Sequence, residues 1–574
     1  MEDAWVSASI EWVLGVLRRS GRGGRVEAFQ CLGVLLNAYR NGLPPQLSEQ
    51  LIPQLTQYLS TADIALLAQT LLINAALLQL APQETFRLTE KQVLPSVYAI
   101  APSPLASSTA PIEALQTFFA ALVEADGQIA THVVPNLIRA VERAPPNERA
   151  PANVAKCVSR IVRSAQSVAA GTIAEFSKYI KKGTKASESQ VVLSLLTLGE
   201  IGRTVDMAQQ SDVFTVCLDY FAAESEELRS AAAFAAGNIT IGNTHVFLPH
   251  LLKLVQSSSE KRLLCLHALK EVVTNALHGQ LEMIADSLWQ PLFQNSQGDD
   301  ATRNMAAACL GKLTTAAPSR YLPQLQARLR DESPAVRATV VSSIRYTFAD
   351  TGHSYDELLS PLIVDFLSLM EDPDLTVRQL SLSALNAAAR NKPQLIREHL
   401  NTLLPRLYKE TAIKPELIRV VQMGPWQHKV DDGLEARKTA YETMYTLLDT
   451  CLARLDVHEL LSRVLAGLAD SADEIKVLCH MMLFRLSQIA PTAVAQRLDD
   501  ATPELQKTMA GAAVTKDTVK QDLERAAEQQ RSALRAIAAL SKINTPGMAP
   551  KFDTMVEDIL RGTWAAEYRE LLEK

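Results

Sequence analysis

The sequence has few aromatic residues and no strong net charge. Phe, Trp and Tyr make up 5% of its 574 residues, whereas hydrophobic residues as a whole make up 47%. A composition of this kind, rich in Leu and Ala, favours closely packed helices over strands. The 57 Lys and Arg residues face 63 Asp and Glu residues, which leaves a formal charge of -6. So small a charge, spread over this length, argues against the strongly positive surface that nucleic-acid binding needs.

Two further absences concern the compartment. The seven cysteines lie far apart, form no CxxC pair and mostly fall within apolar helical patterns. We therefore expect buried thiols in a reducing compartment, and a protein of the cytoplasm and nucleus. The chain starts without a basic segment followed by an apolar one, so no signal peptide is expected. The most apolar stretch, from Leu66, is broken by polar residues and is too short to cross a membrane comfortably, so no membrane is expected.

The sequence also has no motif typical of catalysis or of metal binding. It contains no P-loop, GxSxG, HExxH or kinase-like set of residues. His245 and His250 are five residues apart, but no Cys or carboxylate cluster surrounds them. We therefore predict a protein that is not an enzyme and that has no catalytic residues, no metal and no cofactor. An enzymatic function would require a set of catalytic residues that the fold brings together from distant segments of the chain.

What the sequence does have is a recurring unit. An acidic or Pro-containing turn is followed by a small apolar residue, a base and a helix rich in Ala and Leu. In the copy that starts at Glu371, Asp374 is placed to cap the helix, Val377 and Leu385 fall on one helical face, and Pro393 follows its end. The preceding segment, 361–370, is expected to form the antiparallel partner helix. One such pair cannot bury its own apolar faces, so neighbouring pairs must stack.

The spacing of the recurring base identifies the repeat class. The intervals are 33, 41, 34, 41, 59 and 39 residues, and five of the six match a helix-pair repeat of about 33–47 residues. The sequence therefore predicts an all-α fold: a HEAT-repeat α-solenoid, continuous over residues 1–574, with C-terminal capping helices at 516–574. The bases used as markers are Arg229, Arg262, Arg303, Arg337, Arg378, Arg437 and Lys476.

The interval of 59 carries about 20 residues too many for one repeat, and the excess falls at 409–433. Here β-branched residues lead to Gly424-Pro425, a turn signal that a helix interior would not tolerate. Trp426, His428 and Val430 then alternate with polar residues at the period of a strand. We predict an inserted β-hairpin with its tip near 423–426.

Two interpretations of this hairpin remain open from the pattern alone. An exposed Met and Trp near the tip would be anchors for a protein partner. Alternatively, the segment is a long loop folded back on its own solenoid, with Trp426 filling a local gap.

Several of these segments resemble one protein family. The segment VQMGPWQHKVDDGLEARKTAYETMYTLLDTCLARLDVHELL, from Val421, closely resembles the cullin-associated and neddylation-dissociated proteins. Further similarity lies in NVAKCVSRIV from Asn153, APTAVAQRLD from Ala490 and TVKQDLERAAEQQRSALRAIAAL from Thr518. The resemblance covers nearly the whole chain and is weaker before about residue 150. It extends only to the C-terminal half of the family protein, so the contact with the RING subunit that the resemblance implies would come from a second polypeptide, or be missing because this chain is a fragment.

The resemblance implies a scaffold that binds the N-terminal region of an unneddylated cullin in a cullin–RING ubiquitin ligase. It would block the site where adaptors dock and so promote exchange of substrate receptors. Trp426 and Gln427 stand where Phe and Lys are expected, a conservative change for the anchor. The residues that the resemblance assigns to partner binding are Val421, Met423, Gly424, Pro425, Trp426, Gln427, His428, Val430 and Asp431.

The alternative is a HEAT scaffold of another class, a nuclear-transport receptor or a phosphatase scaffold. These would not need the hairpin, and a transport receptor would be expected to carry a strongly acidic concave face.

The first helix is apolar on more than one face, although terminal repeats normally need a polar outer cap. We therefore expect the residue 1–20 end to dock onto a further HEAT segment, covalently or as a separate chain. The apolar residues concerned are Trp5, Val6, Ile10, Trp12, Val13, Leu14, Val16 and Leu17.

Overall fold

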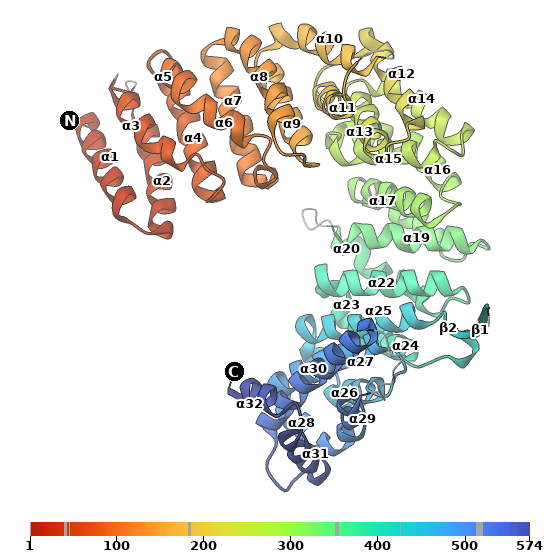
Figure 1. Ribbon diagram of the computed structural model, residues 1–574. Coiled ribbons are helices and arrows are strands. Elements are labelled where there is room, and N and C mark those ends of the chain that lie inside the picture. The colour runs from red at the N-terminus through yellow and green to blue at the C-terminus, as the bar shows by residue number, and fades with distance from the viewer. Residues whose placement is uncertain are drawn as a thin grey trace. The chain divides into compact units, whose positions relative to one another are not determined.

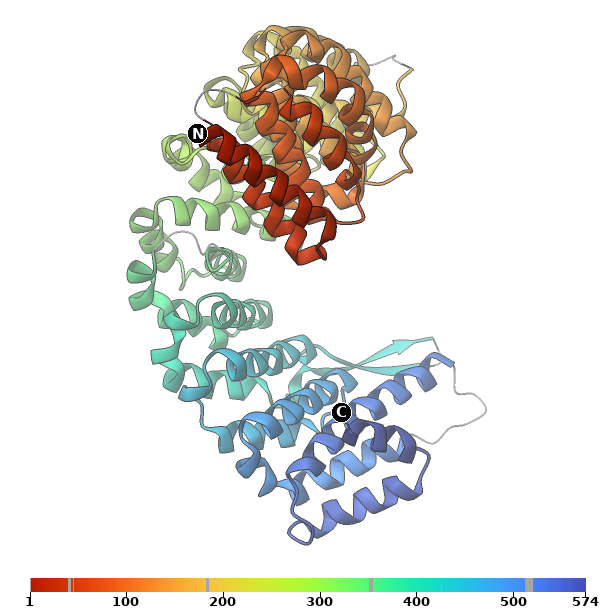
Figure 2. The same ribbon diagram turned by 90° about the vertical axis from the view of Figure 1, so that its left-hand side faces the viewer.

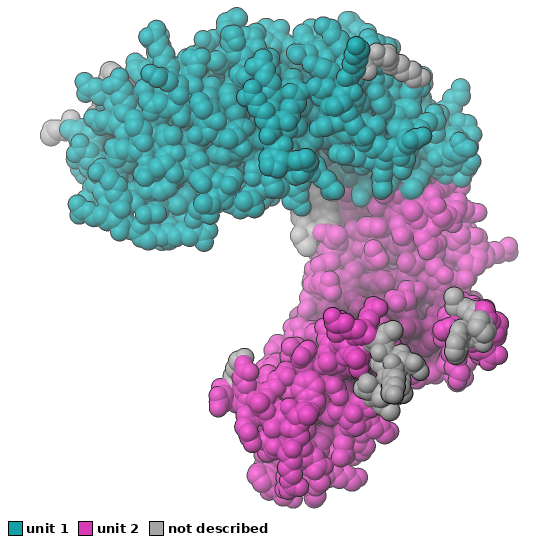
Figure 3. Space-filling view, viewed as in Figure 1, with its two compact units in different colours: residues 1–284 teal, residues 285–574 magenta. Residues whose placement is uncertain are grey.

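The computed structural model of this chain describes residues 2–39, 43–44, 46–181, 185–349, 355–424, 426–511 and 520–573. For Glu2, Asp3, Met423 and Trp426 it describes the backbone only. The described residues are mostly helical, with one pair of strands, which confirms the predicted all-α fold with a hairpin (Figure 1). Two compact units divide the chain, Met1–Ile284 and Ala285–Lys574 (Figure 3). Continuity of the solenoid across them stays a prediction.

The first unit is a stack of two helical layers. Helices α2, α4, α7, α9, α11, α13 and α15 pack one against the next, and α3, α5, α8, α10, α12 and α14 cover one side of them. The helices of this unit are α1 (Glu2–Arg19), α2 (Arg22–Asn37), α3 (Leu47–Leu55), α4 (Ile64–Leu80), α5 (Pro82–Leu88), α6 (Leu94–Ile100), α7 (Thr109–Ala125), α8 (Ala130–Arg143), α9 (Ala150–Ser164), α10 (Ala169–Ile180), α11 (Glu188–Gly202), α12 (Ser211–Asp219), α13 (Glu226–Gly242), α14 (Thr244–Ser257) and α15 (Arg262–Asn275). Helix α16 (His278–Gln294) begins here and ends in the second unit.

The second unit repeats the arrangement, with α17, α19, α22, α25, α27 and α30 as its layer of successive helices. Its elements are α17 (Asp300–Ala316), α18 (Pro318–Ala327), α19 (Pro334–Thr347), α20 (Asp356–Leu359), α21 (Ile363–Leu367), α22 (Leu375–Asn391), α23 (Pro393–Ile396), α24 (Leu400–Glu410), β1 (Ile418–Met423), β2 (Trp426–Asp431), α25 (Leu434–Thr450), α26 (Val457–Gly467), α27 (Asp473–Ile489), α28 (Pro491–Ala495), α29 (Leu498–Ala510), α30 (Lys520–Ile543), α31 (Pro550–Arg561) and α32 (Ala565–Glu573). Within the predicted capping segment 516–574, residues 516–519 and 574 lie outside the described residues, and the rest contains α30 to α32.

Helix α22 shows how the repeat pattern becomes structure. Asp374 caps it, since its Oδ1 accepts a hydrogen bond from the Val377 N–H at 3.0 Å. Val377 and Leu385 are buried, as predicted. The partner segment 361–370 is not one helix, however. It consists of α21 between two 3₁₀ turns, Ser360–Leu362 and Ser368–Glu371.

Six of the seven marker bases occupy one equivalent place, the fourth residue of a helix in the layer of successive helices. Their backbone N–H groups donate to the residue that precedes each helix, as from Arg337 to Ser333 and from Arg437 to Gly433. Arg262 is the exception and a wrong marker, because it is the first residue of α15. This offset explains why the intervals on either side of it, 33 and 41, are unequal.

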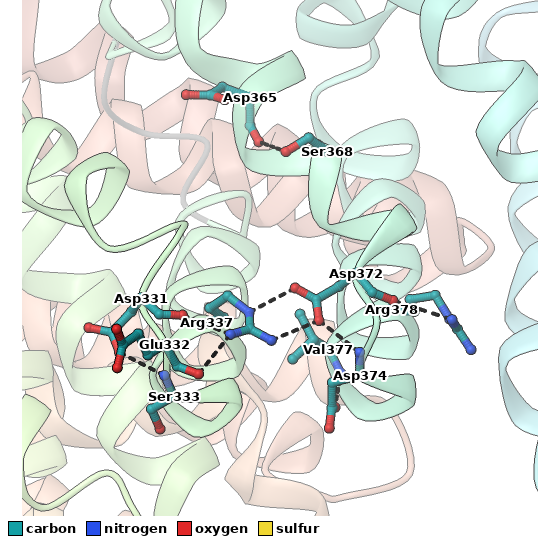
Figure 4. A network of polar contacts seen from close by, with 10 residues as sticks. All are labelled: Asp331, Glu332, Ser333, Arg337, Asp365, Ser368, Asp372, Asp374, Val377 and Arg378. Carbon is teal, nitrogen blue, oxygen red and sulfur yellow. Dashed lines mark hydrogen bonds and ion pairs between the residues drawn. The ribbon is translucent and has the colours of Figure 1, made fainter.

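Arg337 shows what the base does (Figure 4). Its Nη1 donates to the carbonyl groups of Asp331 and Glu332 in the turn before its own helix, at 2.7 and 3.2 Å. Its Nε and Nη2 donate to the two carboxylate oxygens of Asp372 in the next repeat, at 2.8 and 3.0 Å. The Asp372 carboxylate also accepts from the Asp374 N–H. One partly buried guanidinium therefore joins the turns of two successive repeats.

The predicted burial of the cysteines holds for six of them. Cys31 is exposed, because it does not lie on the buried face of α2. Within the described part of the chain, no helix combines the length and the apolar character that a membrane crossing requires.

Close approach between helices α13 and α15 depends on a glycine. A Cβ on Gly237 would overlap the Ala268 carbonyl oxygen and would lie 2.7 Å from the Glu271 Cβ. Gly15 in α1 is the opposite case, since a Cβ there would meet nothing within 4 Å.

Gly237→Ala is expected to destabilise the first unit by about 1–3 kcal/mol, because the added methyl forces α13 and α15 apart. Gly15→Ala, the matched control, should be neutral or stabilising by up to about 1 kcal/mol, because Ala favours a helix over Gly. Differential scanning calorimetry measures both. Equal melting temperatures for the two variants would contradict the close-packing argument.

Candidate partner-binding hairpin

The predicted hairpin is present between α24 and α25. Strand β1 pairs with β2 in antiparallel register, from Ile418 opposite Asp431 to Met423 opposite Trp426. Gly424 and Pro425 therefore connect the strands, and Gly424 has a φ of 61°, in the left-handed region that favours glycine. Pro425 and the side chains of Met423 and Trp426 lie outside the described residues. Figure 2 shows the strands extending away from the helices of the second unit.

The two faces of the hairpin differ. Val421, His428 and Val430 share the face on which positions 423 and 426 fall, and both valines there are half-buried. On the opposite face, Ile418 and Val420 are exposed, Val420 to 58%. Neither residue is in the partner-binding set predicted from the sequence. Gln427, which it did include, is exposed on their face.

The base of the hairpin is held by Arg437, the fourth residue of α25, which is only 1% exposed. Its Nη1 lies 2.9 Å from Oδ2 of Asp431, the last residue of β2. Its Nε and Nη2 donate to the carboxylate of Asp470, in the turn before α27, at 2.7 and 3.1 Å. Asp431 also accepts from the Gly433 N–H at 3.0 Å. The sequence marked Arg437 as a repeat residue but gave no sign that it clamps the hairpin.

A second, exposed pair lies beside this clamp. The Arg419 Nε donates to Asp432 Oδ2 at 2.7 Å, across the base of the hairpin. This hydrogen bond holds the pKa of the Asp432 carboxyl below its ordinary value. Because both groups are in water, the pair orients the strand ends but contributes little to stability.

The fold and the hairpin define the class of this protein: it is an all-α protein of HEAT-type helix pairs with one inserted hairpin. A family described as TATA-binding protein interacting (TIP20) matches residues 395–560, which include the hairpin. A second family, described as stalled ribosome sensor GCN1-like, HEAT repeats, matches residues 246–405.

The curated relatives are more specific. The chain is 35% identical to Cullin-associated NEDD8-dissociated protein 1 of Drosophila melanogaster over 552 residues, 92% of this chain and 44% of that protein. It is 32% identical to the Arabidopsis thaliana protein of the same name, over 95% of this chain and 46% of that protein. A protein of Emericella nidulans named as the C-terminal part is 39% identical over 61% of this chain and 34% of that protein.

These matches confirm the predicted resemblance: the chain is a sequence relative of the cullin-associated NEDD8-dissociated proteins. It spans 44% and 46% of the Drosophila melanogaster and Arabidopsis thaliana proteins and 34% of the Emericella nidulans protein. Among solved structures, yeast importin-β (Kap95p) aligns over 99% of this chain and 72% of its own, at 12% identity and a TM-score of 0.47. Similarity at this level gives no information about function.

Arg437→Met is expected to destabilise the second unit by about 3–5 kcal/mol, because it leaves the buried Asp470 carboxylate without its cation. Arg419→Met, at the exposed pair, should cost at most about 1 kcal/mol. Calorimetry reads the stability of each variant. Hydrogen exchange should also show faster exchange of the β1 and β2 amides in Arg437→Met only. Similar melting and exchange in the two variants would mean that Arg437 is not the clamp.

Proposed function

We propose that this chain binds the N-terminal region of a cullin through the hairpin at 418–431, and so competes with the adaptor modules that dock there. The proposal rests on one observation above others. Within the segment matched by the TIP20-type family, the chain projects a strand pair that carries exposed apolar side chains and has a rigidly paired base. The relatives are named for association with cullins and dissociation of NEDD8.

The physical consequence of such competition is exchange. If the chain and an adaptor each weaken the binding of the other to one cullin, the effect must be reciprocal. A complex in which both are loosely bound then releases either one faster than simple dissociation would. We propose that the chain promotes exchange of substrate receptors in this way, in the cytoplasm and nucleus. Exposure of Met423 and Trp426 stays a prediction.

Trp426→Ala should leave the melting temperature unchanged but weaken cullin binding by about 2 kcal/mol or more, about 30-fold, if the side chain is an exposed anchor. Replacing 421–430 with a Gly/Ser linker should abolish competition with an adaptor for the cullin N-terminal region. The linker keeps Asp431, so that Arg437 retains its partner. Met548→Ala, at an apolar residue that is 79% exposed and lies outside both proposed binding surfaces, is the control and should leave competition intact.

The opposite result is equally clear. Burial of Trp426 against its own solenoid would cost about 3–5 kcal/mol on truncation to Ala and lower the melting temperature. Unchanged competition after the linker replacement would show that the hairpin does not displace adaptors.

We also propose that the exposed face of α1 docks onto a further HEAT segment. Trp5 and Trp12 lie one heptad apart on α1 and are 67% and 71% exposed, whereas Val6, Ile10 and Leu17 are buried against their own unit. Two tryptophans in water on one helical face are typical of a surface that another element covers.

This docking predicts concentration-dependent association of the chain, or capture of a HEAT-repeat segment, in sedimentation velocity. Trp5→Glu with Trp12→Glu should abolish it, because a charge cannot be buried without a partner. A chain that stays monodisperse at high concentration and captures no HEAT segment would contradict the idea.

A further inference from the structure

A groove lies between α27 and α30, which run parallel and side by side in the second unit (Figure 1). One part of it is a hollow of about 540 Å³. Met481 and Phe484 of α27 contribute its exposed apolar surface, at 46% and 43% exposure. Ile543 at the end of α30 and Leu571 of α32 also line it. These apolar side chains are not part of the chain's own buried core.

The hollow is not closed. It continues toward the N-terminal ends of the two helices as a second hollow of about 760 Å³, and the two share Met481, Ser532 and Arg535. Along α27 the lining runs from Asp473 to Gln488. At a rise of about 1.5 Å per residue this is about 22 Å, the length of a helix of about 15 residues. The dimensions therefore suit an elongated occupant.

The two ends of the groove differ in charge. The lining of the first hollow includes Arg535 and Lys542 and no Asp or Glu. Neither base forms an ion pair with any residue that the structure describes, and both are exposed. The second hollow is lined by acids and bases together, such as Asp473 and Arg525, which pair at 3.4 Å. The hollows share Arg535, so they differ in their acids: the first has none among its lining residues, whereas the second is lined by Glu442, Asp473 and Glu528 among others.

His480 gives the first hollow a buried polar wall. The residue is 2% exposed, its Nδ1 lies 3.3 Å from the Ser532 Oγ, and its Nε2 has no hydrogen-bond partner among the described residues. Burial lowers the pKa of His480 to about 4, so the ring is neutral at pH 7. A buried polar atom without a hydrogen-bond partner is uncommon in a folded protein.

We propose that this groove binds an amphipathic α-helix of a partner protein. Its apolar side chains would lie on Met481 and Phe484, and its carboxylates would lie at the end beside Arg535 and Lys542. In helix-in-groove recognition the bound helix supplies apolar anchors at i, i+3, i+4 and i+7, and here Met481 and Phe484 offer the apolar surface beneath them. The inference rests on the proposed function only in that the chain binds a protein; it does not require that the protein be a cullin.

The test uses the full chain and two fluorescein-labelled helical peptides of about 15 residues, the length that fits the groove. Both carry Leu at i, i+3, i+4 and i+7. One has three Glu in its first turn, where they stabilise a helix, and the other has Gln at the same places. Fluorescence polarisation should show tighter binding of the Glu peptide.

Two sets of variants locate the binding. Phe484→Ala should weaken both peptides by about tenfold, and Arg535→Glu with Lys542→Glu should weaken the Glu peptide by about tenfold while changing the Gln peptide less than about twofold. Leu523→Ala is the apolar control, an exposed residue of α30 outside the lining. Arg569→Glu on α32, also outside the lining, is the charge control. Calorimetry verifies that every variant is folded.

Three results would overturn the proposal: binding that neither groove variant weakens, no binding of either peptide at about 1 mM, or dodecanoate occupying the groove where peptides do not. The last would assign the groove to a small anionic amphiphile. Because the peptides carry no cullin sequence, failure to bind a cullin would contradict the proposed function and leave this inference standing. A cullin fragment that loses binding only on hairpin replacement would confine that partner to the hairpin.

Discussion

An arginine that joins successive turns fixes two of the repeat junctions in the second unit, including the one that carries the hairpin. Arg337 reaches Asp372 and Arg437 reaches Asp470, each from the fourth residue of one helix to the turn before the next helix in its layer. In both cases the same carboxylate also accepts the backbone N–H two residues on. A buried guanidinium left unpaired would cost several kcal/mol, so only one register of the repeats satisfies it. The stack is therefore fixed by polar constraint as well as by apolar burial.

This constraint explains where a hairpin can be inserted without disturbing the stack. Asp431 precedes α25 by the same number of residues as Asp372 precedes α22, and it accepts the Gly433 N–H in the same way. The additional residues of the hairpin therefore precede the turn before α25 and leave the geometry of that turn unchanged. A two-stranded sheet is marginal by itself in water. Here the Arg437 and Arg419 pairs hold the strand ends together, and the side chains farther out remain available for a partner.

The sequence was sufficient wherever the physics is local. The Asp374 cap, the apolar face of α22 and the turn at Gly424 follow from neighbouring residues, and all three are in the structure. The error at Arg262 arose because a base near a helix start looks the same whether it is first or fourth. The partners of Arg437 could not be predicted, since Asp470 is distant in sequence and its choice depends on stacking. The groove was missed for the same reason: Phe484 and Arg535 meet only after α27 and α30 pack.

The hairpin base and the groove are mechanically connected. Arg437 binds Asp431 at the end of β2 and Asp470 in the turn that starts α27, and α27 carries Met481 and Phe484. Arg437 therefore joins the half-buried Asp431 at the base of the hairpin to the buried Asp470 ahead of the helix that lines the groove. A partner that contacts both the hairpin and the groove would lose its translational and rotational freedom only once. The second contact would then form at a high effective concentration. Weak binding at each surface would then add up to a tight complex. Loss of contact at either surface would be the first step in release of the partner.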